Sequence, residues 1–279
     1  MTVDLPEYLS PSSAASFDGC PKRWRFKYID RLPEPPSEPA LVGNFAHEVL
    51  EHLCDLPDTE RTVEQAKKLA AAIWPDFALS RNFDELALDD DAKRAFRWKA
   101  WLAIAGLWDL EDPSSIDVVA TEQKVSVELG GVPFLGIVDR VERDGTKLVV
   151  SDYKSGSLPK ARFRDDKIQQ VMLYAAALEA MDGEQPDRVQ LLYLGQQTVA
   201  TAVTDRKVTA AVEQLATTWA GLTTACETDE FTAKTAVLCG WCPFAEHCDE
   251  GIAYLQSRYD KGNLPAHAPA IALLNTTNS

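Results

Sequence analysis

Two tight turns in the middle of the chain constrain its fold more than any other feature. The pairs Gly130-Gly131 and Asp144-Gly145 each separate runs in which apolar residues alternate with polar ones. Pairs of this kind favour the two-residue loops of β-hairpins. The pattern therefore predicts three consecutive antiparallel strands, over Asp117–Leu129, Val132–Arg143 and Lys147–Tyr153.

Charged residues fall on one face of this predicted sheet. A loop at Gly130-Gly131 places Glu122 opposite Asp139, and a loop at Asp144-Gly145 places Asp139 opposite Val150. Because side chains alternate along a strand, Asp139 then shares a face with Asp152 and Lys154. The other residues of that face are apolar: Leu135, Ile137, Val141, Leu148 and Val150.

These charges must satisfy one another or hold a ligand, because burying an unpaired charge costs several kcal/mol or more. Like charges on paired strands repel, and a divalent cation relieves that repulsion. An oxygen-rich cluster with Glu122, Asp139 and Asp152 suits Mg²⁺ or Mn²⁺, and Lys154 is placed to hold or activate a water. The alternative is a salt-bridge network on a solvated face of the sheet.

Helical periodicity surrounds the predicted strands. Apolar residues at three- and four-residue spacing indicate several helices between about Leu41 and Leu110. After the third strand the pattern predicts a helix over 165–181, strands over 188–193 and 199–203, and a helix over 206–224. The N-terminal segment reads as a short helical turn followed by a proline-rich loop. We expect the tail, residues 263–279, to be partly disordered.

Composition and charge narrow the class of protein. The 279 residues, 46% hydrophobic and 25% charged, allow one large domain or two small ones. A formal net charge of −15 argues against a protein that coats nucleic acid through its overall charge. With neither a signal sequence nor a membrane span in evidence, we expect a soluble, cytoplasmic protein. Its six cysteines are then expected to be thiols or ligands rather than disulfides.

Four motifs resemble, in order, those of one enzyme family. The stretches are "GNFAHEVLEHL", "GIVDRVE", "SDYKSG" and "QQVMLYAAAL". They are similar to the histidine, GxxDR, (D/E)xK and QxxxY motifs of the PD-(D/E)XK nuclease superfamily, in its RecB-like and CRISPR-associated exonuclease branch. The likeness extends from Cys20 to Cys248.

That resemblance implies an α/β fold with a restriction-endonuclease-like core of helix, three antiparallel strands, helix and strand. A helical insertion at about 41–110 would precede the core at about 117–226, and a cysteine-rich segment would follow it. We expect a single nuclease domain over residues 1–261 and a tail over 262–279.

The resemblance also implies a role for each motif residue. His47, Asp139 and Asp152 would be metal ligands, with the Tyr153 carbonyl as a possible further one. Lys154 would orient or activate the attacking water, and Gln170 and Tyr174 would position the substrate. Glu122, which lies outside the four motifs, is expected from the strand register to support the ion or a water. The sequence departs from the usual motif at Val138, where many relatives have proline, and at Asp152, where many have glutamate. The expected activity is that of a Mg²⁺- or Mn²⁺-dependent DNA exonuclease.

Four cysteines form a second set of candidate ligands. Cys239, Cys242 and Cys248 are closely spaced, and Cys20 comes from the other end of the chain. Four thiolates hold either zinc or a [4Fe–4S] cluster, and spacing alone leaves both open. The resemblance favours a [4Fe–4S] cluster that joins the two ends of the chain. Cys54 and Cys226 fit buried free thiols better, and His247 is a minor rival ligand for zinc.

Two basic segments are candidates for contacting DNA. "PKRWRFKY" interleaves Arg23 and Arg25 with Trp24, and "KSGSLPKARFRDDK" supplies Arg162 and Arg164 after the (D/E)xK motif. The alternatives are solvated charges and core aromatics. We expect DNA ends or single strands as substrate, with a recombinase, a helicase or a CRISPR adaptation protein as partner in recombination, repair or phage or CRISPR DNA processing.

Two rival functions stay open at this stage. The first is a DNA-binding or scaffold subunit that keeps the fold and cluster without cleaving. The second is a zinc-stapled interaction protein.

Overall fold

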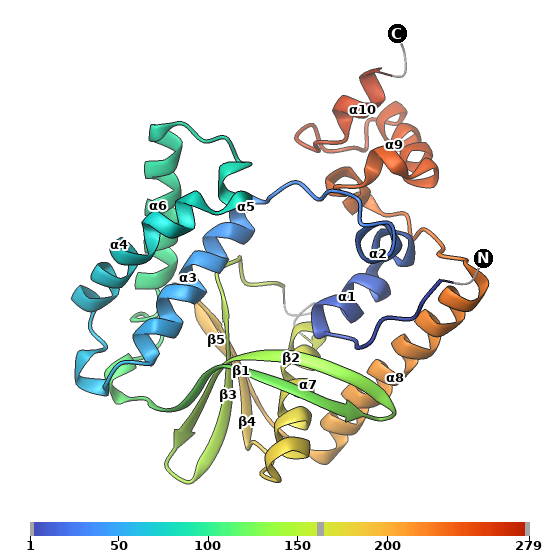
Figure 1. Ribbon diagram of the computed structural model, residues 1–279. Helices are drawn as coiled ribbons and strands as arrows, with labels where there is room; N and C mark the ends of the chain where they lie inside the picture. Colours follow the sequence, from blue (N-terminus) through green and yellow to red (C-terminus); the bar gives the residue numbers. More distant parts are fainter. Residues whose placement is uncertain (1–2, 161–164, 277–279) are drawn as a thin grey trace. The chain divides into compact units, whose positions relative to one another are not determined.

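The computed structural model describes residues 3–160 and 165–276. They form two compact units, one from the described residues of 36–214 and the other from those of 1–35 together with 215–279. Figure 1 labels the elements of both. The single nuclease domain expected over residues 1–261 stays a prediction. None of the described helices combines the length and the hydrophobicity needed to cross a membrane.

A mixed five-stranded sheet is the centre of unit 36–214, and its strands lie in chain order. They are β1 (Asp117–Leu129), β2 (Val132–Asp144), β3 (Lys147–Lys154), β4 (Arg188–Tyr193) and β5 (Gln197–Ala202). Neighbours are antiparallel except β3 and β4, which are parallel. The parallel pair requires a crossover, which helix α7 (Asp165–Asp182) provides. The predicted α/β class and order of core elements are confirmed.

The first hairpin has the predicted loop and register. Gly130 and Gly131 take φ values of +58° and +80°, which glycine adopts without strain. Leu129 pairs with Val132, and the same register brings Glu122 level with Asp139, as predicted.

The strand register of the second hairpin differs from the prediction by two residues, and its loop is displaced by one. Asp144 pairs with Lys147, so the loop is Gly145-Thr146 rather than Asp144-Gly145. Gly145 takes the first loop position because φ is +63° there, a conformation that favours glycine over aspartate. An even shift keeps every side chain on its predicted face, but Val141 now pairs with Val150, and Asp139 lies near the level of Asp152.

The predicted face is also less buried than expected at one end. Ile137 is 50% exposed, so the part of β2 before Asp139 presents that face to solvent. Val141, Leu148 and Val150 on the same face are buried.

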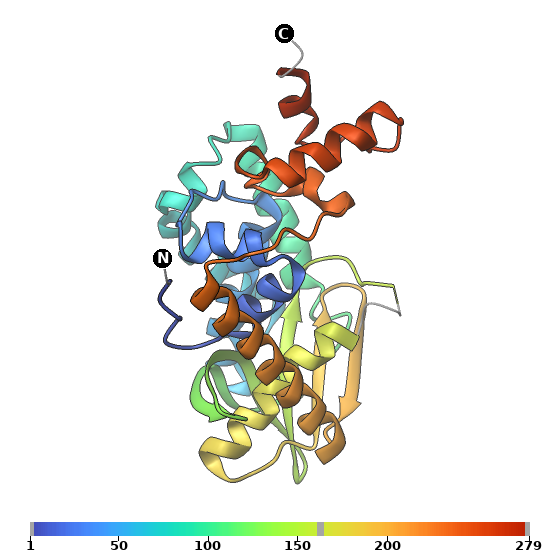
Figure 2. The ribbon, with the colours of Figure 1, turned by 90° about the vertical axis from the view of Figure 1, so that its right-hand side faces the viewer.

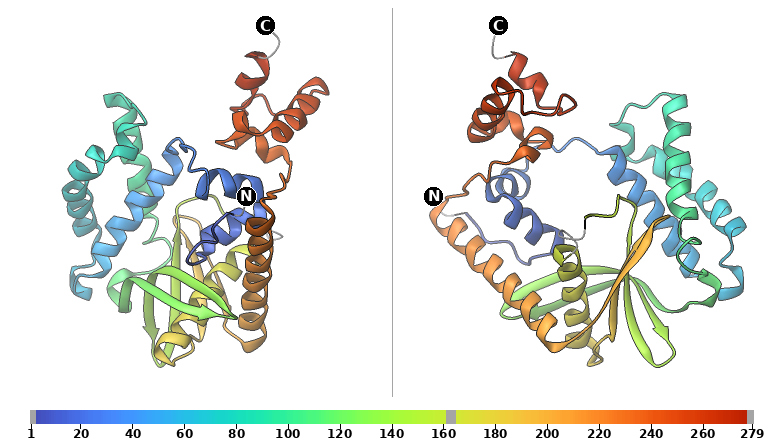
Figure 3. Two further views of the ribbon diagram at one scale, coloured as in Figure 1. Left: turned by 45° about the vertical axis from the view of Figure 1, so that its right-hand side comes forward. Right: turned by 180° about the vertical axis from the view of Figure 1, so that it is seen from behind.

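One layer of helices packs on the sheet, as Figure 3 shows. It consists of α3 (Glu38–Cys54), α4 (Val63–Leu79), α5 (Arg81–Asp84) and α6 (Asp90–Ala105). The side chains of Thr62 and Asp89 cap the N-termini of α4 and α6 by accepting backbone N–H bonds. Apolar residues of these helices form one core with Tyr153, Leu192 and Leu194 of the sheet region. Short 3₁₀ turns lie at Asp58–Glu60 and Pro113–Ser115.

Helix α7 covers the same strands from the other side. It contacts β1 to β4, and its residues from Val171 to Leu178 are all buried. Strands β3 and β4 are buried on both faces as a result, which explains the short apolar runs 148–150 and 191–193. The ring of Tyr174 lies against Gly136 of β2, where an added Cβ would meet Tyr174 Cε1 at 2.7 Å.

The other unit is helical. It contains α1 (Pro11–Gly19), α2 (Pro21–Tyr28), α8 (Asp205–Thr228) from Leu215 onward, α9 (Asp249–Asp260) and α10 (Ile271–Thr276), with 3₁₀ turns at Val237–Trp241 and Ala245–His247. In Figure 2, α1 runs beside the last part of α8, where Thr218 donates a hydrogen bond to Asp18.

Part of the tail is helical, and its expected partial disorder stays a prediction. Helix α10 forms, and Ala270 and Leu274 are buried against Leu255 of α9. The apolar run "AIALL" therefore closes a small core, which its proline-containing surroundings hid from sequence reasoning.

Replacing Gly136 tests the contact between β2 and α7. Gly136→Ala should lower the free energy of unfolding by about 1–3 kcal/mol, because the new methyl group forces the buried Tyr174 ring aside. Urea unfolding followed by circular dichroism measures this. Gly156→Ala, whose Cβ would meet no atom within 4 Å, is the matched control. Equal stability of the two variants would contradict the packing described.

Candidate active site

The candidate site lies where β2 and β3 separate. Their last paired residues are Arg140 and Ser151, and beyond them the backbone ladder stops. The amide of Tyr153 instead donates to Asp139 Oδ2 at 2.8 Å. The carboxylate thereby takes the place of a strand carbonyl and is fixed at the opening.

His47 reaches this opening from α3. Its Nδ1 lies 3.4 Å from Asp139 Oδ2, and its Nε2 donates to the Tyr153 carbonyl at 3.0 Å. One turn earlier, a Cβ on Gly43 would lie 2.7 Å from Ser155 Oγ. The missing side chain at Gly43 lets α3 approach the end of β3. This close approach brings His47 of the same motif to Asp139 and Tyr153.

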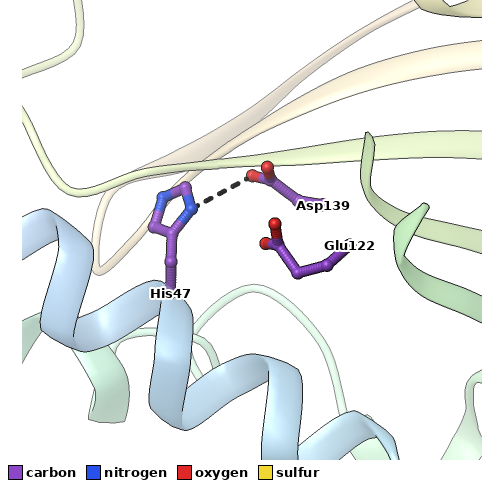
Figure 4. A group of neighbouring side chains, drawn as sticks. All are labelled: His47, Glu122 and Asp139. Atoms are coloured by element: carbon purple, nitrogen blue, oxygen red, sulfur yellow. Dashed lines mark ion pairs between the residues drawn. The ribbon is translucent and has the colours of Figure 1, made fainter. Parts of the chain in front are cut away.

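Glu122 completes a group of three. One ligand atom each of His47, Glu122 and Asp139 lies within 4.8 Å of the others. Figure 4 shows the imidazole and both carboxylates converging. Glu122 has a φ of +43°, which is unfavourable for a residue with a side chain. Strained backbone of this kind is concentrated at functional sites.

Burial and mutual repulsion make the two carboxylates weak acids. Desolvation first, and then the charges of Asp139, Glu51 and Asp152, raise the pKa of Glu122 to about 7. Desolvation and the charge of Asp152 raise the pKa of Asp139 to about 6, against the opposing effect of His47. Two carboxylates that resist ionisation beside an imidazole are a donor set that a divalent cation fits, because its charge favours the ionised forms.

Asp152 and Lys154 form an ion pair next to this group. Asp152 is 3% exposed, and its Oδ2 contacts Lys154 Nζ. Apart from this ion pair, none of the described donors makes a hydrogen bond to that oxygen. Asp152 is not one of the three clustered residues, although its charge acts on both Glu122 and Asp139. Its role as a metal ligand stays a prediction.

A buried arginine holds Tyr153 in place. Arg140 is fully buried, donates to both carboxylate oxygens of Glu111 at 2.6 and 3.0 Å, and donates to the Tyr153 hydroxyl at 2.9 Å. The Tyr153 backbone in turn contacts His47 and Asp139. The arginine of the GxxDR motif is therefore a positioning residue, a role that sequence reasoning did not assign.

Helix α7 places two further predicted residues beside the site. The side chains of Gln170 and Tyr174 are hydrogen-bonded to each other. Burial first, and then the charges of Asp152 and Asp139, raise the pKa of the Tyr174 hydroxyl. Tyr174 is therefore near both carboxylates, and its role with Gln170 in positioning substrate stays a prediction.

Sequence reasoning missed Glu51. It lies one turn after His47 on α3, and its charge contributes to the raised pKa of Glu122. The spacing Gly43, His47, Glu51 puts all three on one face of the helix, and this periodicity was the available signal.

The four predicted thiols come together within the helical unit. They line one small cavity of about 30 Å³. Each sulfur accepts a hydrogen bond from a backbone N–H: Lys234 to Cys20 at 3.4 Å, Ala236 to Cys239 at 3.3 Å, Gly251 to Cys248 at 3.3 Å, and Phe244 to Cys242. Burial raises the pKa of the Cys242 and Cys248 thiols. Cys54 and Cys226 are buried elsewhere.

The basic segment of α2 offers less to DNA than predicted. Trp24 is 1% exposed, donates to Ser13 Oγ at 2.9 Å and stacks on Phe231, so its proposed role as an exposed stacking surface was wrong. An amphipathic helix with one buried face has the same interleaved pattern as a nucleic-acid-binding segment.

The arginines of the two basic segments stay predictions as DNA contacts. Arg25 pairs with Asp229 at 2.6 Å, and Arg23 lies 3.6 Å from Glu34. Arg162 and Arg164 lie outside the described residues.

Comparison with known proteins identifies the class. The family model of the PD-(D/E)XK nuclease superfamily matches residues 8–249, and the chain therefore belongs to this superfamily. A crystal structure described as a "Putative exonuclease" from Eubacterium rectale is similar in fold. It has 16% identity and a TM-score of 0.51, over 85% of this chain and 87% of that one.

A second structure, described as SSO0001, has 12% identity and a TM-score of 0.40 over 89% of each chain. No curated protein matches the chain.

The raised carboxyl pKa values predict how stability depends on pH without metal. Groups whose pKa is raised by folding stabilise the fold fully below their unfolded values, near 4, and lose that contribution as pH rises through 6 and 7. In EDTA, stability should therefore fall from about pH 5 to pH 8. Thermal unfolding should show a larger rise in Tm on adding Mn²⁺ at pH 8 than at pH 5.5. Glu122→Gln should flatten the profile in EDTA, whereas an unchanged profile would contradict the assignment.

Proposed function

We propose that this nuclease is a divalent-metal-dependent deoxyribonuclease that acts as an exonuclease on DNA ends or single strands. The observation that carries the proposal is the convergence of His47, Glu122 and Asp139, with their raised carboxyl pKa values, beside the Asp152–Lys154 pair. The metal, the DNA substrate and the exonuclease mode follow the motif resemblance and the superfamily.

The donors suit Mg²⁺ or Mn²⁺. His47, Asp139 and Asp152 would hold the ion, with the Tyr153 carbonyl as a further oxygen donor and Glu122 in support. A bound cation of this kind supplies Lewis acidity toward a phosphodiester oxygen and lowers the pKa of a water. The buried Asp152 Oδ2, whose partner among the described residues is the Lys154 ammonium, has acceptor capacity left for such an ion.

Lys154 supplies the positive charge that the reaction needs. Its ammonium group is held against Asp152 at the end of β3, so its position is set before substrate arrives. From there it orients the attacking water and stabilises the negative charge that develops on the phosphoryl oxygens. Gln170 and Tyr174, held to each other on α7, position the strand beside these groups.

Degradation of end-labelled linear single- and double-stranded DNA with Mg²⁺ or Mn²⁺ tests the proposal. Asp139→Asn and Lys154→Met should each slow cleavage about 100- to 1000-fold, because each removes a charge placed for the reaction. Asp144→Asn is the matched control, since Asp144 lies at the solvent-exposed end of the same strand. DNA that stays intact with the wild-type protein, but is bound by it, would favour the non-cleaving DNA-binding subunit.

We also propose that Cys20, Cys239, Cys242 and Cys248 hold a [4Fe–4S] cluster, as in the RecB-like and CRISPR-associated branch. The support is the shared cavity and the backbone N–H bond to each sulfur, which stabilises a thiolate. Such a cluster would join residues more than two hundred positions apart and restrict the unfolded chain. Zinc at the same thiolates is the alternative.

Anaerobic purification followed by metal analysis separates the two. A [4Fe–4S] site predicts about four iron and four sulfide per chain and a broad visible absorption band, and zinc predicts one colourless ion. Cys242→Ser should lose the metal, and Cys226→Ala should keep it because Cys226 is buried away from the cavity. Equal metal content in both variants would overturn the assignment.

The resemblance to the RecB-like and CRISPR-associated branch suggests in which DNA-processing pathways the enzyme acts. We propose a role in recombination, repair, or phage or CRISPR DNA processing, with a recombinase, a helicase or a CRISPR adaptation protein as partner.

A further inference from the structure

A cavity of about 300 Å³ lies between α4 and α6, away from the candidate active site. Its sides come from two helices that pack against each other in unit 36–214 (Figure 3). Ala70 and Ala71 of α4 leave the space open because their side chains are short, and Trp98 and Trp101 of α6 stand beside it. Trp98 is 61% exposed, an unusual position for the largest apolar side chain.

Helix α6 has two distinct faces. Phe96, Ala100 and Ile104 are fully buried in the core of the helical layer. A second face with the helical spacing i, i+3, i+4, i+7 consists of Arg94, Arg97, Trp98 and Trp101, and all four line the cavity. On the second face Trp101 also packs partly against this core, but core packing does not explain the exposed Arg94, Arg97 and Trp98.

The cavity is locally cationic on a strongly acidic chain. Its charged lining residues are Lys67, Arg94 and Arg97, and no carboxylate is among the described residues that line it. Lys67 Nζ lies 5.4 Å from the centre of the Trp101 ring. Arg94 also pairs with Asp91, but both side chains are well exposed, and such pairs contribute little. With a net charge of −15 on the chain, three cations around two indole rings mark a place for an anion with flat faces.

We propose that this cavity binds single-stranded DNA, with a base stacked on the exposed Trp98 and phosphates bound by Lys67, Arg94 and Arg97. The proposal rests on the proposed nuclease function and extends it to a second contact with the strand. Single strands supply both exposed base faces and regular negative charge, which this lining complements. A protein segment would need acidic residues around an apolar anchor, and it is the outcome to be distinguished.

The position of the cavity defines its role. Phe45 of α3 lines the cavity, and His47 of the same helix belongs to the candidate active site. Residues two positions apart on a helix, such as Phe45 and His47, point about 200° apart. The cavity and the site therefore lie on different sides of α3. The cavity therefore holds a part of the strand distant from the bond that is cut, and it contributes only when the strand is long enough to reach both.

Binding measured in EDTA tests this without any need for cleavage. The probes are fluorescent single-stranded DNA of about six and about 30 nucleotides, which bracket typical site sizes. Trp98→Ala should weaken binding of the long strand roughly tenfold, because stacking on the indole is lost, and should weaken the short strand less, because a short strand cannot reach both the cavity and the active site. Arg97→Gln should weaken the long-strand complex and reduce its salt slope by about 1. Trp98→Phe should restore most of the affinity.

Two variants with the same charge change serve as controls. Lys68→Gln on α4 and Lys93→Gln on α6 alter exposed lysines that do not line the cavity, and both should bind as the wild type does. Melting curves of the Trp98, Lys68 and Lys93 variants should coincide, since those side chains are exposed, whereas Arg97→Gln also loses a contact with the Trp74 ring. Wild-type affinity of Trp98→Ala for the long strand would overturn the proposal and leave the cavity to a protein segment. Cleavage of the short strand in Mg²⁺ tests the nuclease function separately.

Discussion

One hydrogen bond organises the candidate site: the amide of Tyr153 donates to the carboxylate of Asp139 instead of to a strand carbonyl. This exchange ends the β2–β3 ladder, fixes a carboxylate in a desolvated place and leaves the Tyr153 carbonyl for His47. The hydroxyl at the far end of Tyr153 is bound by the buried Arg140. Because Tyr153 is held at both ends, the groups around it are arranged before any ligand binds, and the cost is a set of carboxylates with raised pKa values.

Most of the sheet could be predicted from the sequence because its signals are local. Glycine at a positive φ marks a hairpin loop, and alternation then assigns each side chain to a face. The second loop shows the limit of this reasoning, since Asp144-Gly145 and Gly145-Thr146 both fit the pattern. The error of two residues preserved the faces, so the charged face was predicted correctly. The closeness of Asp139 to Asp152 was underestimated.

Features that depend on packing between distant segments could not be predicted in this way. The sequence around Trp24 is compatible both with an exposed stacking surface and with a buried core position. The contact with the distant Phe231 shows that Trp24 is in the core. The second face of α6 has ordinary helical spacing, and its meaning depends on the alanines of α4 opposite it. Gly43 was recognised as part of a motif, but its reason, the approach of α3 to Ser155, lies in three dimensions.

Helix α3 contributes residues both to the candidate active site and to the cavity between α4 and α6. Gly43 rests against Ser155, His47 faces the carboxylates, and Phe45 borders the cavity between α4 and α6. A helix confined on several sides cannot shift at one of these contacts without disturbing the others, because packed interiors deform little. Any ligand that moves α3 from the cavity is therefore energetically coupled to whatever binds at His47. Thermodynamic linkage makes that coupling free energy equal in both directions. Binding at the active site therefore changes the affinity of the cavity for its ligand by the same factor.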